Sequence, residues 1–397
     1  MSKAYLVLAD GSIFEGKSIG AQGKTIGETV FTTGMTGYVE TLTDPSYYGQ
    51  IVTQTFPLIG NYGIENEDFE SRKSFVSGYI VRELCDGPSN FRCQGDLDSF
   101  LKVQGIIGIC GIDTRALTKK LRESGVMNGM ILSGEILDLE KNLEEIRTYT
   151  IKDAVKSVQD ASVVKVIPEA EIVFPKAETV VPGPTQHSCS GGSLKLLSQF
   201  FDARHVEGPS ICLFDFGAKA NIERELEKRG CKVTVVPFDT TAEKVISMKP
   251  DGIMLSNGPG DPAENVGVIE EIRKLCDYGK IPILGICLGH QMLSLARGAK
   301  TCRLKYGHRG GNHPVKDVRS GRVFITSQNH GYAVEASTLP DFARETFVNL
   351  NDGTCEGVEY TDIPAFSVQF HPEACGGPHD TNFLFDRFLE MIKNATK

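Results

Sequence analysis

From about residue 210 onward, apolar strand-like runs alternate with amphipathic helix-like runs. Each strand-like run is continuously rich in Val, Ile and Leu, which is typical of strands buried on both faces. The alternation predicts an α/β fold in which a mostly parallel sheet carries helices on both faces. In such sheets ligands bind beyond the carboxyl ends of the strands, so motifs at those ends are the first candidates for a functional site. The predicted strands are 211–216, 232–238 and 252–256, and the predicted helices are 221–229, 241–248 and 262–278.

The amino-terminal part of the chain shows a less regular pattern. Short strand-like runs at 4–8, 50–54 and 75–81 are mixed with one clear helix-like run at 114–123. Asp113 precedes that run in the position of an amino-terminal cap. The mixture predicts a domain with both α and β elements.

The length of 397 residues exceeds what a single hydrophobic core usually supports, so two domains are expected. Residues 151–209 contain a stretch with four prolines and end in a Ser/Gly-rich segment, a composition typical of a connection between domains. We therefore expect an amino-terminal domain at 1–150, a linker region at 151–209 and a second domain at 210–397.

The composition argues against several classes of function. Acidic residues outnumber basic ones and the net charge is −9, so neither a nucleic-acid partner nor an anionic membrane is expected. No stretch approaches the roughly 20 apolar residues of a membrane span, and the first residues resemble a strand rather than a signal peptide. The eleven cysteines include no CxxC pair, which favours a reducing, cytoplasmic setting.

The strongest chemical motif is GICLGHQ at 285–291, where an apolar run ends at a cysteine flanked by two glycines. Such a strand-to-helix turn holds its nucleophile in a strained backbone conformation, in which flanking side chains would collide. It places the Cys287 sulfur at a helix amino terminus, which favours the thiolate, and it offers the amide of Leu288 as an oxyanion donor. A cysteine at a strand end is more often an ordinary core residue, but the flanking glycines favour a nucleophile.

A thiolate needs a base that can also protonate the leaving amine, and histidine suits both roles. His371 ends a strand-like run, and Glu373 follows it closely enough to fix its tautomer. His290 competes because it lies within one helical turn of the cysteine, although its side chain could point into packing. His330 is expected in a turn between strands, where it could shape the pocket. Cys375 is a second thiol that lacks the elbow motif.

A third motif, LSNGPGDP at 255–262, ends a predicted strand with two glycines and two prolines. Its backbone amides could bind a substrate carboxylate or complete an oxyanion hole. The same residues could equally form an ordinary tight turn between a strand and a helix. The motif is not a nucleotide phosphate loop, because GxxxxGK[ST] is absent from it.

Three motifs together resemble the class I, or triad, glutamine amidotransferase domain: GICLGHQ, FHPE at 370–373 and SNGPGDP at 256–262. Further motifs are similar to the small subunit of carbamoyl-phosphate synthetase, and this resemblance covers nearly the whole chain. These further motifs are TGMTGY at 33–38, LTDPSY at 42–47, GIDTRALT at 111–118, DFGAKANI at 215–222 and YGHRGGNHP at 306–314.

The resemblance implies a role for individual residues. Cys287 would be the nucleophile, His371 the general base and acid, and Glu373 the group that orients the histidine. The amides of Gly258 and Leu288 would stabilise the oxyanion. The residues implied to hold glutamine are Ser46, Gly260, Gln291, Asn329, Gly331 and Tyr332. Ser46 belongs to the amino-terminal domain, so the pocket is expected between the two domains.

The resemblance also implies a reaction and a partner. The thiolate attacks the glutamine side-chain amide, ammonia leaves, and water hydrolyses a γ-glutamyl thioester. Ammonia would pass to a large subunit that uses ATP and bicarbonate to make carbamoyl phosphate for pyrimidine or arginine biosynthesis. No metal or cofactor is expected in this chain, since ATP and Mg²⁺ would bind the partner.

Three other hypotheses compete with this one. The chain could be a glutaminase that serves another acceptor, but such enzymes need no domain like the one at 1–150. It could be a module that only regulates its partner. It could also be a hydrolase with the α/β-hydrolase fold, but there the acid precedes the histidine in the chain, whereas Glu373 follows His371.

Overall fold

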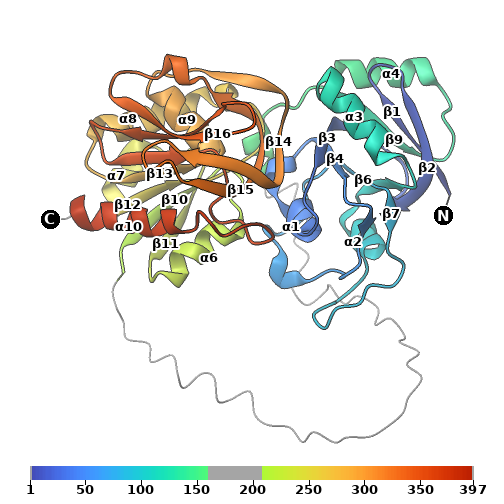
Figure 1. The fold of residues 1–397 in the computed structure, drawn as a ribbon, viewed down its shortest axis with the longest axis horizontal. Coiled ribbons are helices and arrows are strands. Elements are labelled where there is room, and N and C mark those ends of the chain that lie inside the picture. Colours follow the sequence, from blue (N-terminus) through green and yellow to red (C-terminus); the bar gives the residue numbers. More distant parts are fainter. Residues whose placement is uncertain (1, 160–207, 396–397) are drawn as a thin grey trace, which may run out of the picture.

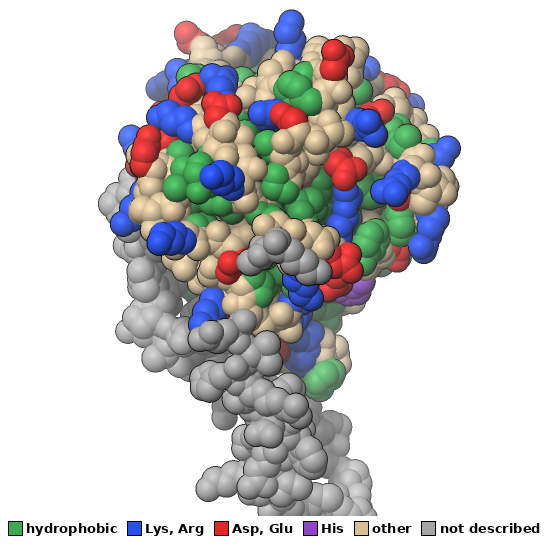
Figure 2. Space-filling view, turned by 90° about the vertical axis from the view of Figure 1, so that its left-hand side faces the viewer, with side chains coloured by type: hydrophobic (Ala, Val, Ile, Leu, Met, Phe, Trp, Pro, Cys, Tyr) green, Lys and Arg blue, Asp and Glu red, His purple; other side chains and the backbone are tan. Residues whose placement is uncertain are grey.

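The computed structural model describes residues 2–159 and 208–395, which form two lobes that lie side by side (Figure 1). One lobe holds the amino-terminal elements and the other holds the elements from residue 210 onward. No helix among these described residues is long and apolar enough to cross a membrane. Figure 2 shows one face of the carboxyl-terminal lobe, on which basic and acidic side chains are interspersed with apolar ones.

The amino-terminal lobe is built on a closed seven-stranded barrel in the order β1-β2-β8-β6-β4-β3-β9. Its strands are β1 (Lys3–Leu8), β2 (Ile13–Gly20), β3 (Lys24–Thr32), β4 (Gln50–Gln54), β6 (Gly78–Val81), β8 (Ile107–Cys110) and β9 (Met127–Ser133). The helices are α1 (Tyr38–Thr43), α2 (Leu97–Gln104), α3 (Thr114–Ser124) and α4 (Leu139–Thr148). Smaller elements are η1 (Pro45–Tyr47), β5 (Leu58–Ile59), η2 (Asn66–Asp68) and β7 (Glu83–Leu84).

The mixed α and β character of this lobe was predictable, but its closure was not. The predicted strands at 4–8 and 50–54 and the helix at 114–123 are present, whereas the strand predicted at 75–81 begins only at Gly78. The Asp113 side chain accepts a hydrogen bond from the amide of Ala116 (2.9 Å), as expected of a cap. Closure depends on the antiparallel pairing of β1 with β9, which are far apart in the sequence.

The carboxyl-terminal lobe contains a nine-stranded sheet in the order β11-β10-β12-β13-β18-β17-β15-β14-β16. Its first five strands are mutually parallel, and the other four pair antiparallel. The parallel strands are β10 (Ser210–Asp215), β11 (Lys232–Pro237), β12 (Gly252–Leu255), β13 (Ile283–Ile286) and β18 (Ala365–Val368). The antiparallel strands are β14 (Thr301–Asp317), β15 (Val323–Val334), β16 (Ala343–Asn349) and β17 (Cys355–Tyr360).

Helices cover both faces of the parallel part, as predicted. On one face α7 (Ala242–Met248), α8 (Val266–Tyr278) and α9 (Leu288–Ala296) pack against the sheet through an apolar cluster. On the other face α6 (Ala220–Lys228) and α10 (Phe383–Ala395) pack through a second cluster. Two short helical turns complete the lobe, η4 (Pro262–Glu264) and η5 (Ala336–Thr338).

Most of the expected linker region, 160–207, lies outside the described residues. The first part of the expected linker contains a helix, α5 (Ala154–Gln159). This helix was not predicted, because the whole segment was expected to be a connection between domains. Val155 is buried in the apolar cluster of α7, α8 and α9, so α5 packs against the carboxyl-terminal lobe. Arg72 donates a hydrogen bond to the carbonyl of Val158 (3.0 Å), which also ties α5 to the amino-terminal lobe.

Candidate active site

The cysteine elbow forms at the carboxyl end of β13, which lies between the parallel strands β12 and β18. Cys287 directly precedes α9 and has φ 53° and ψ −104°, a conformation that L-residues rarely adopt. Its amide donates to the carbonyl of Val368 on the neighbouring β18 (2.9 Å), and the amide of Gly289 donates to the carbonyl of Ser256 (3.0 Å). The strained nucleophile position that the sequence predicts is therefore present.

The glycines on either side of Cys287 are required by close backbone contacts. A Cβ on Gly285 would lie 2.8 Å from the carbonyl oxygen of Gly289, and a Cβ on Gly289 would lie 2.3 Å from that of Leu255. The motif at 255–262 packs against the same turn, since a Cβ on Gly258 would lie 2.8 Å from Cδ2 of Leu288. Among the described residues, no acceptor is recorded for the amide of Gly258 or Leu288.

His371 and Glu373 are both buried, and they are joined by a hydrogen bond of 2.7 Å between Nδ1 and Oε1. A third buried group completes the arrangement, because the ammonium of Lys219 lies 3.1 Å from the same Oε1. The other ring nitrogen of His371, Nε2, is buried without a hydrogen-bond partner among the described residues. Nε2 is therefore the ring nitrogen that remains available to a further partner.

The charges of these groups determine how they hold protons. Burial lowers the pKa of His371 and Lys219 lowers it further, but Glu373 and the Cys287 sulfur raise it, and the net effect is a rise to about 10. Burial raises the pKa of Glu373, but the positive charges of Lys219 and His371 outweigh burial and lower it to about 2. The histidine is thus held in its charged form next to an ionised carboxylate.

The rival groups are placed differently. His290 is fully buried, its Nδ1 lies 2.8 Å from the Ser367 hydroxyl, and burial lowers its pKa to about 3. His330 is not in a turn, as predicted, but inside β15, opposite His308 of β14. Cys375 is exposed and lines a separate cavity. Neither rival histidine has a hydrogen bond to Glu373, as His371 does, and Cys375 lacks the positive φ of Cys287.

A cavity of about 310 Å³ opens over the elbow and is bounded by both lobes. It brings together Cys287 and seven of the eight residues predicted to bind glutamine or its oxyanion, which are Ser46, Gly258, Gly260, Gln291, Asn329, Gly331 and Tyr332. Leu288, the eighth, lies in the adjoining first turn of α9 with a buried side chain. At rest, the Cys287 thiol is 3.6 Å from the carbonyl oxygen of Asn329.

Direct contacts between the lobes hold the walls of this cavity together. The Asn257 amide donates to the hydroxyl of Ser46 (2.9 Å), so the first lobe is tied to the turn after β12. The Asn329 amide donates to the carboxylate of Asp44 (3.0 Å). All four side chains are buried, so these hydrogen bonds are shielded from water.

Sequence reasoning missed Lys219, Asp44 and Asn257. All three were included only as parts of longer motifs, because no local pattern in the sequence indicates that a lysine will be buried beside two carboxylates. Lys219 is 3.9 Å from Asp44 as well as 3.1 Å from Glu373.

Two family profiles match the chain. The profile described as "Carbamoyl-phosphate synthase small chain, CPSase domain" matches residues 6–131, and the one described as "Glutamine amidotransferase class-I" matches residues 212–391. The carbamoyl phosphate synthase small chain of Clostridium perfringens is 48% identical over 98% of this chain and 99% of its own length. That of Fusobacterium nucleatum is 47% identical over 100% of both chains. The chain therefore belongs to the family of carbamoyl phosphate synthase small chains and carries a class I glutamine amidotransferase domain.

Proposed function

We propose that this chain hydrolyses glutamine to glutamate and ammonia through a Cys287–His371–Glu373 triad. The observation that carries the proposal is the combination of a strained cysteine at the floor of a two-lobed cavity with a buried imidazole whose Nε2 has no other partner. Family membership supports the same reaction class.

The proposed reaction uses each of these groups in turn. The Cys287 thiolate attacks the side-chain carbonyl carbon of glutamine, and the amides of Leu288 and Gly258 bind the oxyanion. The tetrahedral intermediate collapses as His371 transfers its proton to the leaving nitrogen, which releases ammonia and leaves a γ-glutamyl thioester. His371 then takes a proton from water, the resulting hydroxide breaks the thioester, and glutamate and the thiol are released. Glu373 holds the imidazole in position throughout.

The remaining cavity residues would hold the α-amino and α-carboxylate groups of glutamine. Both hydrogen bonds of the Gln291 side chain use its Nε2, which donates to the backbone carbonyl of Tyr332 (2.7 Å) and to Oε1 of Gln369 (2.9 Å). We therefore assign its Oε1 to the substrate ammonium. Ser46, Gly260 and the backbone of Gly331 lie on the same walls and supply polar groups for the carboxylate.

Ammonia would be delivered to a large synthetase subunit that makes carbamoyl phosphate from bicarbonate and ATP. The family name, small chain, supports such a partner. A second cavity of about 340 Å³ supports an exit on the other side of the triad, because His371 lines it and Asn329 lines both cavities. We place ATP and Mg²⁺ on the partner and assign no cofactor to glutamine hydrolysis in this chain.

Glutamate release from glutamine tests the proposal. The purified chain is assayed alone and with the large subunit, ATP and bicarbonate, beside a Cys287→Ala variant. We expect slow release that rises sharply with the partner, no release by Cys287→Ala, and normal synthesis from added ammonia by the complex that contains the variant. A rate of glutamate release that does not change when the partner is added would indicate another acceptor enzyme. No release in any condition would indicate a regulatory module.

Cysteine labelling separates a catalytic chain from a regulatory one independently of turnover. Iodoacetamide should modify Cys287 ahead of the other ten cysteines, since a thiolate reacts faster than a thiol. Uniform labelling, or labelling confined to the exposed Cys375, would contradict the assignment of Cys287 as the nucleophile.

A further inference from the structure

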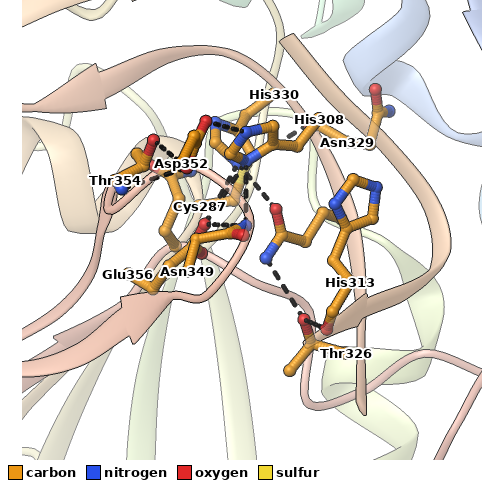
Figure 3. Close-up of polar contacts among 12 residues, drawn as sticks. Cys287, His308, His313, Thr326, Asn329, His330, Asn349, Asp352, Thr354 and Glu356 are labelled. Atoms are coloured by element: carbon orange, nitrogen blue, oxygen red, sulfur yellow. Dashed lines mark hydrogen bonds and ion pairs between the residues drawn. The ribbon is translucent and has the colours of Figure 1, made fainter. Parts of the chain in front are cut away.

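Three side chains that could bind a metal ion converge beside the glutamine cavity, outside the triad. His308 lies on β14, His330 on β15 and Glu356 on β17, and all three are buried. One nitrogen or oxygen atom of each lies within 4.8 Å of the other two (Figure 3). No metal was expected in this chain, since the resemblance places ATP and Mg²⁺ on the partner. The three residues lie on three separate strands and share no short sequence spacing.

The atoms that face one another are Nδ1 of His308, Nε2 of His330 and Oε1 of Glu356. Nδ1 of His308 is 3.4 Å from this oxygen, and Nε2 of His330 is 4.0 Å from it. The other carboxylate oxygen, Oε2 of Glu356, is buried without a hydrogen-bond partner in the described part of the chain. An ionised carboxylate with an unpartnered buried oxygen is costly unless a cation neutralises it.

The groups around this cluster orient the ligands as metal sites require. Nε2 of His308 is 2.8 Å from the carboxylate of Asp352, and Nδ1 of His330 is 2.7 Å from the backbone carbonyl of Tyr332. In a neutral ring each contact fixes the proton on the outer nitrogen and turns the lone pair of the inner nitrogen toward the cluster, where Nδ1 of His308 also lies 3.3 Å from the side-chain amide nitrogen of Asn349. Carboxylates and carbonyls commonly orient metal-binding histidines in this way. Asn349 orients Glu356 by donating to its Oε1 (3.0 Å).

The hydrogen bonds of His330 cannot all be satisfied by a neutral ring. The Thr326 hydroxyl donates to the carbonyl of His313 (2.9 Å), and its oxygen accepts from Nε2 of Gln328 (3.1 Å). The side-chain oxygen of Gln328, Oε1, therefore faces Nε2 of His330 at 3.1 Å. A neutral imidazole has one N–H, and the shorter contact, to Tyr332, uses it. The lone pairs of Nε2 of His330 and Oε1 of Gln328 then face each other at 3.1 Å with no proton between them.

The rings of His308 and His330 also lie close together, with their centroids 4.9 Å apart. A bound cation would satisfy the lone pairs of both rings and the carboxylate of Glu356 with both rings neutral.

We propose that His308, His330 and Glu356 bind a divalent metal ion of the zinc class. The fourth ligand would be the side-chain oxygen of Gln328, Oε1. Imidazole nitrogens suit zinc and its neighbours, and four protein ligands are typical of a structural site. Tetrahedral zinc, with bonds of about 2.1 Å, separates its ligand atoms by roughly 3.4 Å. The pair formed by His308 and Glu356 already has this spacing, and the His330 nitrogen would move about 0.6 Å toward Glu356.

Such a site would fasten β14, β15 and β17 together behind the cavity. His330 lies between Asn329 and Gly331, two residues of the cavity wall, so the ion would hold that strand in register. It has no part in the proton transfers proposed for Cys287 and His371. The inference therefore stands whether or not the chain hydrolyses glutamine.

Metal analysis of the full-length chain tests the proposal. The protein is equilibrated with Zn²⁺, freed of excess ion, and measured by inductively coupled plasma mass spectrometry beside Glu356→Gln and Glu359→Gln. Glu359 lies on the same strand but is partly exposed and paired with Arg387, so it is the matched control. We expect one tightly held ion per chain in the parent and in Glu359→Gln, and a loss of at least tenfold in affinity in Glu356→Gln.

Cobalt substitution decides the identity of the ligands even where Glu356→Gln fails to fold. Co²⁺ bound by nitrogen and oxygen in a tetrahedral site gives intense visible bands, whereas thiolate ligands add a charge-transfer band in the near ultraviolet. We expect the visible bands without the charge-transfer band. A parent chain that retains no Zn²⁺, a Glu356→Gln variant that binds like the parent, or a Co²⁺ spectrum with thiolate ligation would each overturn the proposal.

Discussion

Replacing Gly289 with alanine should disable the elbow without removing any reacting group. The added Cβ would lie 2.3 Å from the backbone carbonyl oxygen of Leu255, whereas ordinary contacts begin at 3.4 Å, so the start of α9 must retreat by about 1 Å. Misplacing a reacting atom by this distance lowers turnover by about 100-fold. Overpacking of this kind also costs about 1–3 kcal/mol of the free energy of unfolding, or roughly 2–12 °C in Tm.

The assay is steady-state glutamate release by the complex, with thermal unfolding followed by circular dichroism on the same samples. Gly267→Ala is the control, because a Cβ there meets nothing within 4 Å and its exposed position is in the first turn of α8. Alanine is favoured over glycine in a helix by about 1 kcal/mol, so this control should keep full activity and an equal or higher Tm. A Gly289→Ala variant with parental kcat and Tm would refute the reasoning about close contact.

Three further predictions concern the triad. His371→Asn should lower kcat for glutamine by about 10³-fold or more while synthesis from ammonia persists, and near-normal turnover would move the base to His290 or His330. Because the folded-state pKa of His371 is raised to about 10, the stability it contributes is fully present below about pH 6.5 and lost as pH rises through 10. Urea unfolding between pH 7 and 10 should therefore show a loss that His371→Asn lacks, and identical slopes would contradict it. Lys219→Met should lower the free energy of unfolding by about 3–5 kcal/mol, since it leaves Glu373 and Asp44 without their buried cation, and an unchanged urea midpoint would exclude that role.

The parts of the site that the sequence predicts are those coded over a few neighbouring residues. The elbow is readable because glycines at fixed offsets from Cys287 are a local steric requirement. His371 and Glu373 are two residues apart, so their hydrogen bond needs only a bend at a strand end. Strands β10, β11 and β12 were predicted within about a residue because each is an apolar run. The strand predicted to end at His371 was placed wrongly, because β18 ends at Val368 and His371 lies beyond the bend that follows.

The parts that the sequence does not predict depend on contacts between distant segments. Asn-His-Gly indicates a turn, yet the long pairing of β15 with β14 keeps His330 inside a strand, so tertiary pairing overrides a local preference. Burial of Lys219 requires both lobes, because its partners Asp44 and Glu373 come from opposite ends of the chain. Barrel closure likewise depends on the pairing of β1 with β9, and no short sequence pattern indicates that pairing.

The strained backbone at Cys287 sets stability against activity at one position. Glycine accepts a positive φ without strain, whereas a non-glycine residue in so sparsely populated a region costs about 1–3 kcal/mol. Cys287→Gly would therefore relax the elbow and remove the sulfur in the same step. Directed evolution of this chain for heat resistance alone would favour the loss of its nucleophile, so only selection that demands glutamine turnover preserves the cysteine.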